Sequence, residues 1–165
     1  MPYLIAVDPH LSVKKPAGVA IFVGKQTYLI HLYRWSLATL LEYTASPYLA
    51  IEDRHAVIEK PYVGVNPKQS IELAIICGKI AQVFSQQGFG VHWADSWGSK
   101  SAWTKQALGR GRKIPKREDA KRLSIMKAKG VWSGFGQAID EHTADAANIG
   151  QWWLDNHIPR LEKMV

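Results

Sequence analysis

The chain has 165 residues, one cysteine and a formal net charge of +7, and 47% of its residues are hydrophobic and 21% charged. This length fits a single domain, which we expect to span residues 1–165 and to bury a substantial core. No apolar run approaches the roughly 18 residues of a membrane span. The first apolar run does not resemble a signal peptide, because Asp8 interrupts it. A lone cysteine excludes an internal disulfide. We therefore expect a cytoplasmic protein with no membrane partner.

Three strands are predicted in the first 33 residues. Residues 3–8 form a short apolar run, which is typical of a buried strand, and Asp8 closes it. A second strand is predicted at 17–23, a turn at 24–25 and a third strand at 27–33. Because short connections join them, these strands predict an antiparallel meander.

A crossover and a fourth strand follow. Residues 35–52 combine helically spaced leucines with Pro47, which indicates a crossover with at least one helix. Residues 56–59 form a second short buried run that ends in a carboxylate, Glu59. Since a crossover precedes it, this strand can lie parallel to the first strand and beside it. Asp8 and Glu59 are then expected side by side at one edge of the sheet.

The second half of the chain is predicted to be mainly helical. Its expected elements, in order, are a helix at 67–87, a strand at 88–95, a helix at 99–108, a basic loop at 109–113, a helix at 115–129, an aromatic-dotted loop at 130–138 and a helix at 140–156. The pattern predicts an α/β fold with a five-stranded mixed sheet, in which two parallel strands join the meander of three, flanked by helices.

The helix predicted at 67–87 has two notable features. Cys77 lies among isoleucines, which favours a buried structural thiol over a nucleophile. Small and apolar residues also follow one side of the helix, namely Ile71, Ala74, Ile75, Gly78 and Val83.

The last predicted helix opens with a cluster of polar residues. His142 and Asp145 are three residues apart, so on a helix they share a face. Asp140 lies five residues from Asp145 and points elsewhere. The spacing favours His142 as the neighbour of Asp145 but leaves the choice among residues 140–142 open. Small residues would let this helix press closely onto a sheet, namely Ala144, Ala146 and Ala147.

If this helix crosses the sheet edge at Asp8 and Glu59, three carboxylates and an imidazole converge. Such a cluster repels itself unless cations sit in it, and oxygen-rich ligands suit Mg²⁺ or Mn²⁺ better than Zn²⁺. Two such ions can activate water on one side of a phosphodiester and stabilise the leaving oxygen on the other. Taken singly, each residue has a structural alternative: Asp8 as a loop cap, Asp145 as an acid in the first turn of a helix, and His142 as a capping or core histidine.

The basic residues are concentrated in one segment. Residues 99–129 carry eleven Lys or Arg against two acids, a net charge of +9, so the rest of the chain is slightly acidic. A basic segment on a nearly neutral body favours a polyanionic partner, with nucleic acid as the default. The alternative, a solvated helical face, usually interleaves both signs of charge.

The order of the acidic motifs resembles the RuvC family of Holliday junction resolvases: Asp8 ends the first strand, Glu59 ends the fourth, and His142-x-x-Asp145 opens the last helix. The resemblance covers nearly the whole chain, although His10 stands where the family usually has glycine and Asn148 departs from its terminal motif. Three further stretches are similar to the family. The first is Ile58-Glu59, which is followed by an apolar run, by Asn66 and by a helix that contains Gly78. The other two are Lys105-Gln-Ala-Leu-Gly-Arg-Gly-Arg-Lys113 and Asp145-Ala-Ala-Asn-Ile-Gly.

The resemblance implies a ribonuclease-H-like fold, a homodimer whose face includes the 67–87 helix, and a crossover junction endodeoxyribonuclease that nicks four-way DNA symmetrically in recombination, repair or DNA debranching. It implies two Mg²⁺ ions per active site, replaceable by Mn²⁺, bound by Asp8, Glu59 and Asp145. His142 would be a metal ligand or would orient the attacking water, and Tyr62 falls where the family stacks an aromatic on unpaired bases. The residues implied along the DNA phosphates are Lys100, Lys105, Arg110, Arg112, Lys113, Lys116 and Lys121.

Two rival functions share much of this pattern. A metal nuclease of the same fold that cuts flaps, other branched DNA or RNA–DNA hybrid would carry identical acids, and the dimer separates the two because a monomer cannot make paired cuts. A binding module that cleaves nothing is disfavoured because all four candidate catalytic positions are filled. An actin-like or sugar-kinase-like ATPase needs two such domains with phosphate loops, which 165 residues cannot hold.

Overall fold

The computed structural model describes residues 2–10, 17–23, 26–32, 53–64, 66–98, 101–109, 116–132 and 139–158. The predicted crossover at 35–52, the turn at 24–25 and most of the basic loop at 109–113 lie outside these ranges. Within them, no helix is both long and apolar enough to cross a membrane. The elements are the strands β1 (Tyr3–Asp8), β2 (Ala17–Val23), β3 (Gln26–Leu32), β4 (Arg54–Glu59) and β5 (Gly90–Ala94), and the helices α2 (Pro67–Gln86), α3 (Ala102–Leu108), α4 (Arg117–Trp132) and α5 (Glu141–His157).

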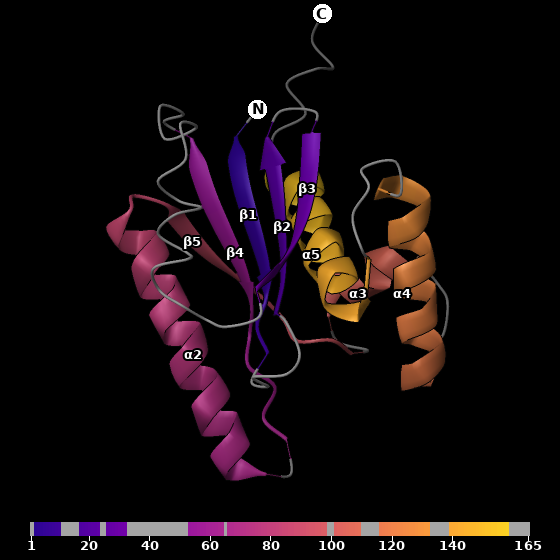
Figure 1. Cartoon of the computed structure of the whole chain (residues 1–165), viewed down its shortest axis with the longest axis horizontal. Coiled ribbons are helices and arrows are strands. Elements are labelled where there is room, and N and C mark those ends of the chain that lie inside the picture. Colours follow the sequence, from indigo (N-terminus) through magenta and orange to yellow (C-terminus); the bar gives the residue numbers. More distant parts are fainter. Residues whose placement is uncertain are drawn as a thin grey trace, which may run out of the picture.

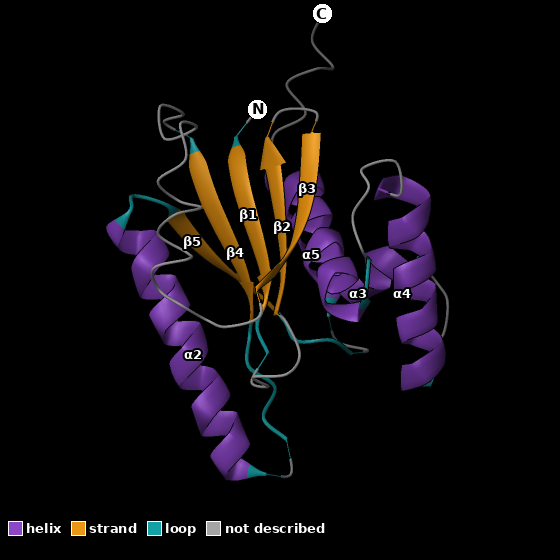
Figure 2. Cartoon of the chain, viewed as in Figure 1, coloured by secondary structure: helices purple, strands orange, loops and turns teal. Residues whose placement is uncertain are grey.

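One sheet holds the five described strands in the order β3-β2-β1-β4-β5 (Figures 1 and 2). β1 pairs antiparallel with β2, and β2 with β3, so the predicted meander is confirmed. β4 lies parallel to β1, as predicted, and β5 lies parallel to β4. The register pairs Val7 with Ile58. Asp8 and Glu59 are the next residues on these two strands, so both carboxylates leave the sheet at the same edge.

Helices cover both faces of the sheet, with α2 on one face and α3, α4 and α5 on the other (Figure 1). The alternation of side chains along β1 explains this arrangement, because successive residues point to opposite faces. Tyr3, Ile5 and Val7 belong to the core on the α2 side, while Leu4 and Ala6 belong to the core on the α5 side. All five are at most 2% exposed. β1 is therefore buried on both faces, as its unbroken apolar run predicts.

Several helix boundaries differ from the predicted ones by one to three residues. α3 begins three residues later, because the Ser101 hydroxyl accepts a hydrogen bond from the Thr104 N–H and caps the first turn. α5 begins one residue later, because the Asp140 carboxylate caps it. α4 runs to Trp132, so the first residues of the loop predicted at 130–138 are helical. The glycine at that point lowers helix propensity by only about 1 kcal/mol, which neighbouring turns can offset.

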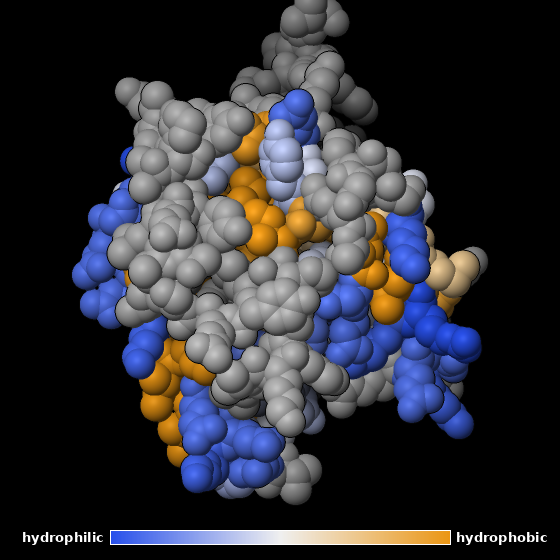
Figure 3. Space-filling view, in the orientation of Figure 1, coloured by the Kyte–Doolittle hydropathy of each residue, from blue (hydrophilic) through white to orange (hydrophobic). Residues whose placement is uncertain are grey.

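The long helix α2 has one buried and one exposed apolar side. Of the apolar side predicted from the sequence, Val83 is buried, whereas Ile71 and Ile75 are 61% and 52% exposed. Hydrophobic atoms accordingly reach the surface along this helix (Figure 3). The exposed row is a candidate interaction surface. The buried residues of α2 are Cys77, Ile80, Val83 and Phe84. The burial of Cys77 confirms the predicted buried thiol.

Candidate active site

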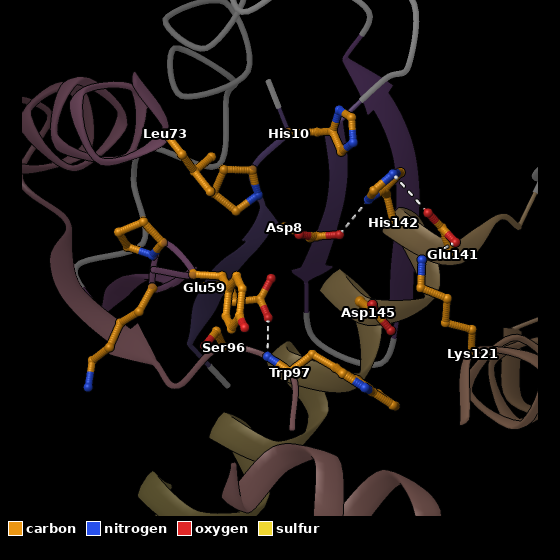
Figure 4. Close-up of a pocket in the computed structure, with 14 residues that line it drawn as sticks. Asp8, His10, Glu59, Leu73, Ser96, Trp97, Lys121, Glu141, His142 and Asp145 are labelled. Carbon is orange, nitrogen blue, oxygen red and sulfur yellow. Dashed lines mark hydrogen bonds and ion pairs between the residues drawn. The ribbon is translucent and has the colours of Figure 1, made fainter. Parts of the chain in front are cut away.

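The structure brings the four residues predicted to do chemistry into one cleft (Figure 4). Asp8 and Glu59 reach it from the ends of β1 and β4, and His142 and Asp145 reach it from the first turns of α5. The cleft has a volume of about 560 Å³. Parts of the chain more than a hundred residues apart in sequence therefore meet at one point.

α5 can deliver His142 and Asp145 because its first turns lie directly against β2. Gly18 in β2 makes the approach possible, since a Cβ there would overlap the backbone carbonyl of His142. A larger residue at this position would push the start of the helix, and both functional side chains, away from Asp8. The row of small residues predicted to pack closely is fully buried, namely Ala144, Ala146 and Ala147.

Glu59 is held by the segment that follows β5. The Trp97 N–H donates a hydrogen bond to Glu59 Oε1 at 2.7 Å. The Trp97 ring packs edge-on against that of Trp103, with ring centres 5.2 Å apart. Trp103 is buried, and its indole N–H donates to the Asp95 carbonyl at 2.6 Å. Trp103 thus packs against the residue whose amide holds Glu59 Oε1, and the Glu59 carboxyl group also shares a side-chain hydrogen bond with Asp8.

His142 is paired with Asp8 through Nδ1, and the described residues give its Nε2 no hydrogen bond. A hydrogen bond of 2.8 Å links His142 Nδ1 and Asp8 Oδ2, and the two side chains are only 12% and 8% exposed. His142 Nε2 is also buried, and it makes no hydrogen bond within the described part of the chain. It lies 3.4 Å from Glu141 Oε1, while Glu141 Oε2 accepts from Lys121 Nζ at 2.6 Å. A buried imidazole nitrogen in this state has unused capacity to bind a ligand.

Asp145 is oriented by two polar residues that the sequence analysis did not identify. The Ser124 hydroxyl donates to Asp145 Oδ1 at 2.9 Å, and Asn148 Nδ2 donates to Ser124 Oγ at 2.9 Å. Both supporting residues are buried. Asn148 lies three residues after Asp145, so helical spacing could have indicated it. Ser124 comes from α4, and no local signal in the sequence points to it.

Burial raises the pKa of all three carboxyl groups. The pKa values of Asp8 and Glu59 lie well above the ordinary range, first because burial disfavours the charged form and then because a negative charge is near, Asp145 for Asp8 and Asp8 for Glu59. The pKa of Asp145 rises to about 7, again by burial and then by the charge of Glu59, while its hydrogen bond from Ser124 acts in the opposite direction. The cluster is therefore short of positive charge.

The donor set of the cleft fits divalent cations of the Mg²⁺ class. Carboxylate oxygens predominate, which suits Mg²⁺ or Mn²⁺, and the buried His142 Nε2 is a further donor. In the described ranges, no three His, Cys, Asp or Glu side chains are yet gathered closely enough to enclose an ion. They pair with one another instead, as Asp8 does with His142. A cation would take the place of the protons that the raised pKa values retain.

The residues predicted to contact DNA are distributed unevenly around the cleft. Tyr62 lines the cleft and is 65% exposed. Lys121 also lines it and pairs with Glu141. Lys105 and Lys116 are exposed but do not belong to the cleft lining. Outside the described residues lie Lys100, Arg110, Arg112 and Lys113.

Two further ionisable residues line the cleft: His10, which had no predicted role, and Glu141, which the sequence left open as a neighbour of Asp145. His10 follows Asp8 by two residues, and its ring centre lies 4.5 Å from that of His142, edge to face. Glu141 immediately precedes His142 and lines the cleft with it, while Asp140 caps the helix. His10 has no sequence signal except its nearness to Asp8, whereas Glu141 lies four residues before Asp145 and so shares a helix face with it.

The whole structure is similar to solved structures of RuvC. T. thermophilus RuvC in complex with Holliday junction substrate superposes with a TM-score of 0.58 at 13% identity, with 92% of each chain covered. A second structure, of Thermus thermophilus RuvC, has a TM-score of 0.54 at 13% identity and covers 93% of this chain and 95% of that chain. The fold is that of RuvC. No protein-family model matches the sequence, and no curated protein matches it significantly.

The RuvC-like fold confirms the predicted architecture, a mixed sheet of the ribonuclease-H-like kind flanked by helices. In this RuvC-like sheet the cleft lies where two neighbouring parallel strands, β1 and β4, both end. Parallel neighbours present the residues after their ends to the same place, which is a common location for functional groups in α/β proteins. At 13% identity the similarity concerns the architecture, so the chemistry must be argued from the residues in this cleft.

Proposed function

We propose that this protein is a divalent-metal-dependent endonuclease that resolves four-way DNA junctions by paired symmetric nicks. The observation that supports this most is the convergence of Asp8, Glu59, His142 and Asp145 in one cleft. Carboxyl groups of raised pKa in a cleft are typical of catalytic and metal-binding sites. The RuvC-like fold, and the Holliday junction substrate in one of the similar structures, support branched DNA as the substrate.

When bound, two Mg²⁺ ions, or Mn²⁺ in their place, supply the charge that activates water on one side of a phosphodiester and stabilises the leaving oxygen on the other. Asp8, Glu59 and Asp145 would hold these ions. Trp97 N–H anchors Glu59 Oε1, and Ser124 anchors Asp145 Oδ1. Each of these two carboxylates thus has one oxygen anchored by a neighbouring donor, which would keep its orientation while it binds a cation.

His142 has a different role in the proposal. Its Nδ1 bond to Asp8 fixes the orientation of the ring, as the outer hydrogen bond of a metal-binding histidine usually does. The buried Nε2 is then available as a metal ligand or as an acceptor that orients the attacking water. Asp8 therefore contributes both a charge and the alignment of the imidazole beside it.

The proposed DNA contacts lie at the rim of the cleft and beyond it. Tyr62 is exposed at the rim, where stacking on an unpaired base contributes roughly 1–3 kcal/mol. The residues that would contact phosphates are Lys100, Lys105, Arg110, Arg112, Lys113, Lys116 and Lys121. Binding should then weaken steeply with salt and depend little on base sequence.

A second copy of the chain completes the proposal, because paired nicks need two clefts. The exposed side of α2 supports this, since Ile71 and Ile75 are large, apolar and more than half exposed. A two-fold dimer also matches a junction that is itself nearly two-fold symmetric. The molar mass in solution tests this part: we expect a dimer for the wild type and a monomer when Ile71 and Ile75 are both changed to Glu.

Cleavage of a cruciform plasmid with Mg²⁺ tests the function. Paired nicks linearise the circle, whereas single nicks only relax it. We expect linear product from the wild type and none from Asp8→Asn, which should still bind junctions because the basic segment is unchanged. Asp95→Asn is the matched control: this carboxylate is exposed, pairs with Lys60 and does not line the cleft, so the variant should cut like the wild type.

Other outcomes would overturn the proposal. Cutting of flaps or RNA–DNA hybrid with the junction spared would favour the rival nuclease. Tight junction binding without cutting of any substrate would leave the binding module. Full activity in Asp8→Asn, Glu59→Gln and Asp145→Asn, each still folded, would exclude this cleft as the active site. A cytoplasmic location and a role in recombination, repair or DNA debranching stay predictions.

A further inference from the structure

Two buried polar side chains, Ser124 of α4 and Asn148 of α5, lie beside Asp145 without lining the cleft. They are 1% and 4% exposed. Ser124 stands between Ala120 and Ala128, which lie one helical turn away on either side and are fully buried. These three small residues share the face of α4 that packs on α5 (Figure 1). Small apolar residues suffice for such a contact, so the polar pair needs a separate explanation.

The chemistry of the three groups fixes the direction of the two hydrogen bonds. Asn148 Nδ2 lies 2.9 Å from Ser124 Oγ and can only donate, so the serine oxygen accepts. The single hydroxyl proton is then directed to Asp145 Oδ1, 2.9 Å away, because an ionised carboxylate only accepts. With the amide reversed, its oxygen and Asp145 would compete for that one proton. This orientation of the amide is therefore the one that lets both hydrogen bonds form.

Asn148 also limits the other hydrogen bond that Ser124 can make. A serine inside a helix can donate its hydroxyl proton to the backbone carbonyl four residues earlier, which here belongs to Ala120. Donation from Asn148 to Ser124 Oγ polarises the hydroxyl group and strengthens its bond to the carboxylate. Without the amide, the hydroxyl would be divided between the Ala120 carbonyl and Asp145. Asn148 therefore directs the hydroxyl to the carboxylate, although its own hydrogen bond goes to Ser124.

We propose that Asn148 is a positioning residue, which acts through Ser124 to keep the Asp145 carboxylate in the orientation that binds a divalent cation. The inference rests on the proposed function, in which Asp145 is a metal ligand, and it adds a residue that acts on this ligand indirectly. Outer hydrogen bonds orient metal-binding side chains, and their loss typically costs about 10–100-fold in metal affinity. Because Ser124 is on α4 and Asp145 is on α5, the orientation of the ligand depends on the contact between these two helices.

Mn²⁺ binding to the whole protein without DNA tests the inference, with the free ion measured by electron paramagnetic resonance. Affinity for Mn²⁺ should fall by about 10–100-fold in Ser124→Ala, which removes the hydroxyl and matches the alanines around it. It should fall by about 10-fold in Asn148→Leu, which keeps the branched shape and removes the donor. Asn148→Ala removes the donor without adding bulk and should show the same loss. The double variant Ser124→Ala with Asn148→Leu should bind no more weakly than Ser124→Ala alone, because Asn148 acts only through the serine.

Asn156→Leu is the matched control, because it makes the same change on the same helix. The Asn156 amide donates to Gln106 Oε1 on α3 at 3.1 Å, so this variant also loses a hydrogen bond between helices. Neither residue lines the cleft, and Mn²⁺ affinity should stay at the wild-type value.

The Mg²⁺ dependence of junction cleavage adds a second readout. Asn148→Leu should need about 10-fold more Mg²⁺ to reach half of its maximal rate, while the maximal rate stays close to that of the wild type. A purely structural role in helix packing would instead lower the rate at every Mg²⁺ concentration, because excess metal does not restore packing.

Two results would overturn the inference. One is wild-type Mn²⁺ affinity in a folded Asn148→Leu or Asn148→Ala variant. The other is a double variant in which the losses of the two single variants multiply, since independent effects do not act through one hydroxyl. The junction assay separates this inference from the proposed function. Junction cleavage by the wild type, together with unaltered Mn²⁺ binding in Asn148→Leu, would keep the function and exclude the positioning role. Mn²⁺ binding that depends on Asn148 in a protein that cuts no junction would keep the positioning role and exclude the function.

Discussion

The two ends of β4 each carry a cluster of ionisable side chains, and the clusters balance their charge differently. At the end of the strand, Glu59 meets Asp8 and Asp145, whose pKa values are all raised, mainly by burial. Near its start, His55 Nδ1 and His92 Nε2 share a hydrogen bond of 3.1 Å. Both imidazole rings pack against Trp153, with ring centres 4.6 Å and 4.8 Å away.

The members of the histidine cluster form hydrogen bonds with one another without needing charge, whereas the members of the carboxyl cluster cannot compensate their own negative charge. His55 Nε2 lies 2.7 Å from Asp53, and the pKa of His92 is lowered by burial and then by the nearby His55 and His157. A neutral imidazole both donates and accepts, so two rings can pair without any charge, whereas ionised carboxylates only accept and repel one another. A buried polar cluster therefore points to an external ion when its own members cannot compensate its charge.

The largest expected difference between the two clusters concerns cleavage. Glu59→Gln should lower the rate of junction cleavage by about a thousandfold, the scale of losing a group that stabilises transition-state charge. His55→Gln should leave the rate unchanged. Single-turnover cleavage of a synthetic junction measures both rates. Equal losses in the two variants would show that the clusters act together, contrary to the comparison.

Divalent metal should stabilise the wild-type protein through the carboxyl cluster. At a Mg²⁺ concentration of 100 times its Kd, the free energy of unfolding should rise by about 2.7 kcal/mol, and EDTA should reverse the gain. Urea unfolding at pH 8 measures it. Because the ion is expected to bind at Asp8, the gain should be lost in Asp8→Asn and retained in His55→Gln, and the opposite pattern would place the ion at the histidines.

Without metal, the charge of Asp145 should cost stability at alkaline pH. The folded-state pKa of about 7 lies above the ordinary value of 3.8, so the stabilising proton is fully present below about pH 4 and lost as the pH rises through 7. Such a rise corresponds to at most about 4 kcal/mol, and solvent in the open cleft reduces this to about 1–2 kcal/mol. In EDTA at pH 8, the Asp145→Asn variant should therefore unfold at a higher urea concentration than the wild type. Near pH 4 the two proteins should unfold at similar urea concentrations.

The histidine cluster should show the opposite and smaller dependence on pH. The folded-state pKa of His92 lies below its ordinary value of 6.5, so stability is lost as the pH falls from above 6.5 through the folded-state pKa. The ring is partly exposed, so we expect a loss of only about 0.5 kcal/mol. Thermal unfolding at pH 7 and pH 5 should show a smaller loss in His92→Asn, and an equal loss in both proteins would contradict this assignment.

The features of the fold that could be predicted were those that depend on the spacing of residues along the chain. The apolar run of β1, the closing Asp8 and the crossover before β4 together indicate two parallel neighbours whose ends meet, and the β1–β4 pairing has that arrangement. Helix starts were predicted less well, because a cap depends on which hydroxyl or carboxylate reaches a backbone N–H, as Ser101 does for Thr104. Spacing alone does not decide between two nearby candidates for a cap.

The sequence by itself determined the strand order around β1, the convergence of Asp8 and Glu59, and the common face of His142 and Asp145, because these follow from periodicity and from the short reach of neighbouring turns. Only the tertiary structure decided what surrounds them. Ser124 and Asp145 are 21 residues apart and meet because α4 packs on α5. His10 and His142 meet across the cleft through the closeness of α5 to β2, which Gly18 permits. Such contacts depend on how the helices pack on the sheet, and no local sequence pattern indicates them.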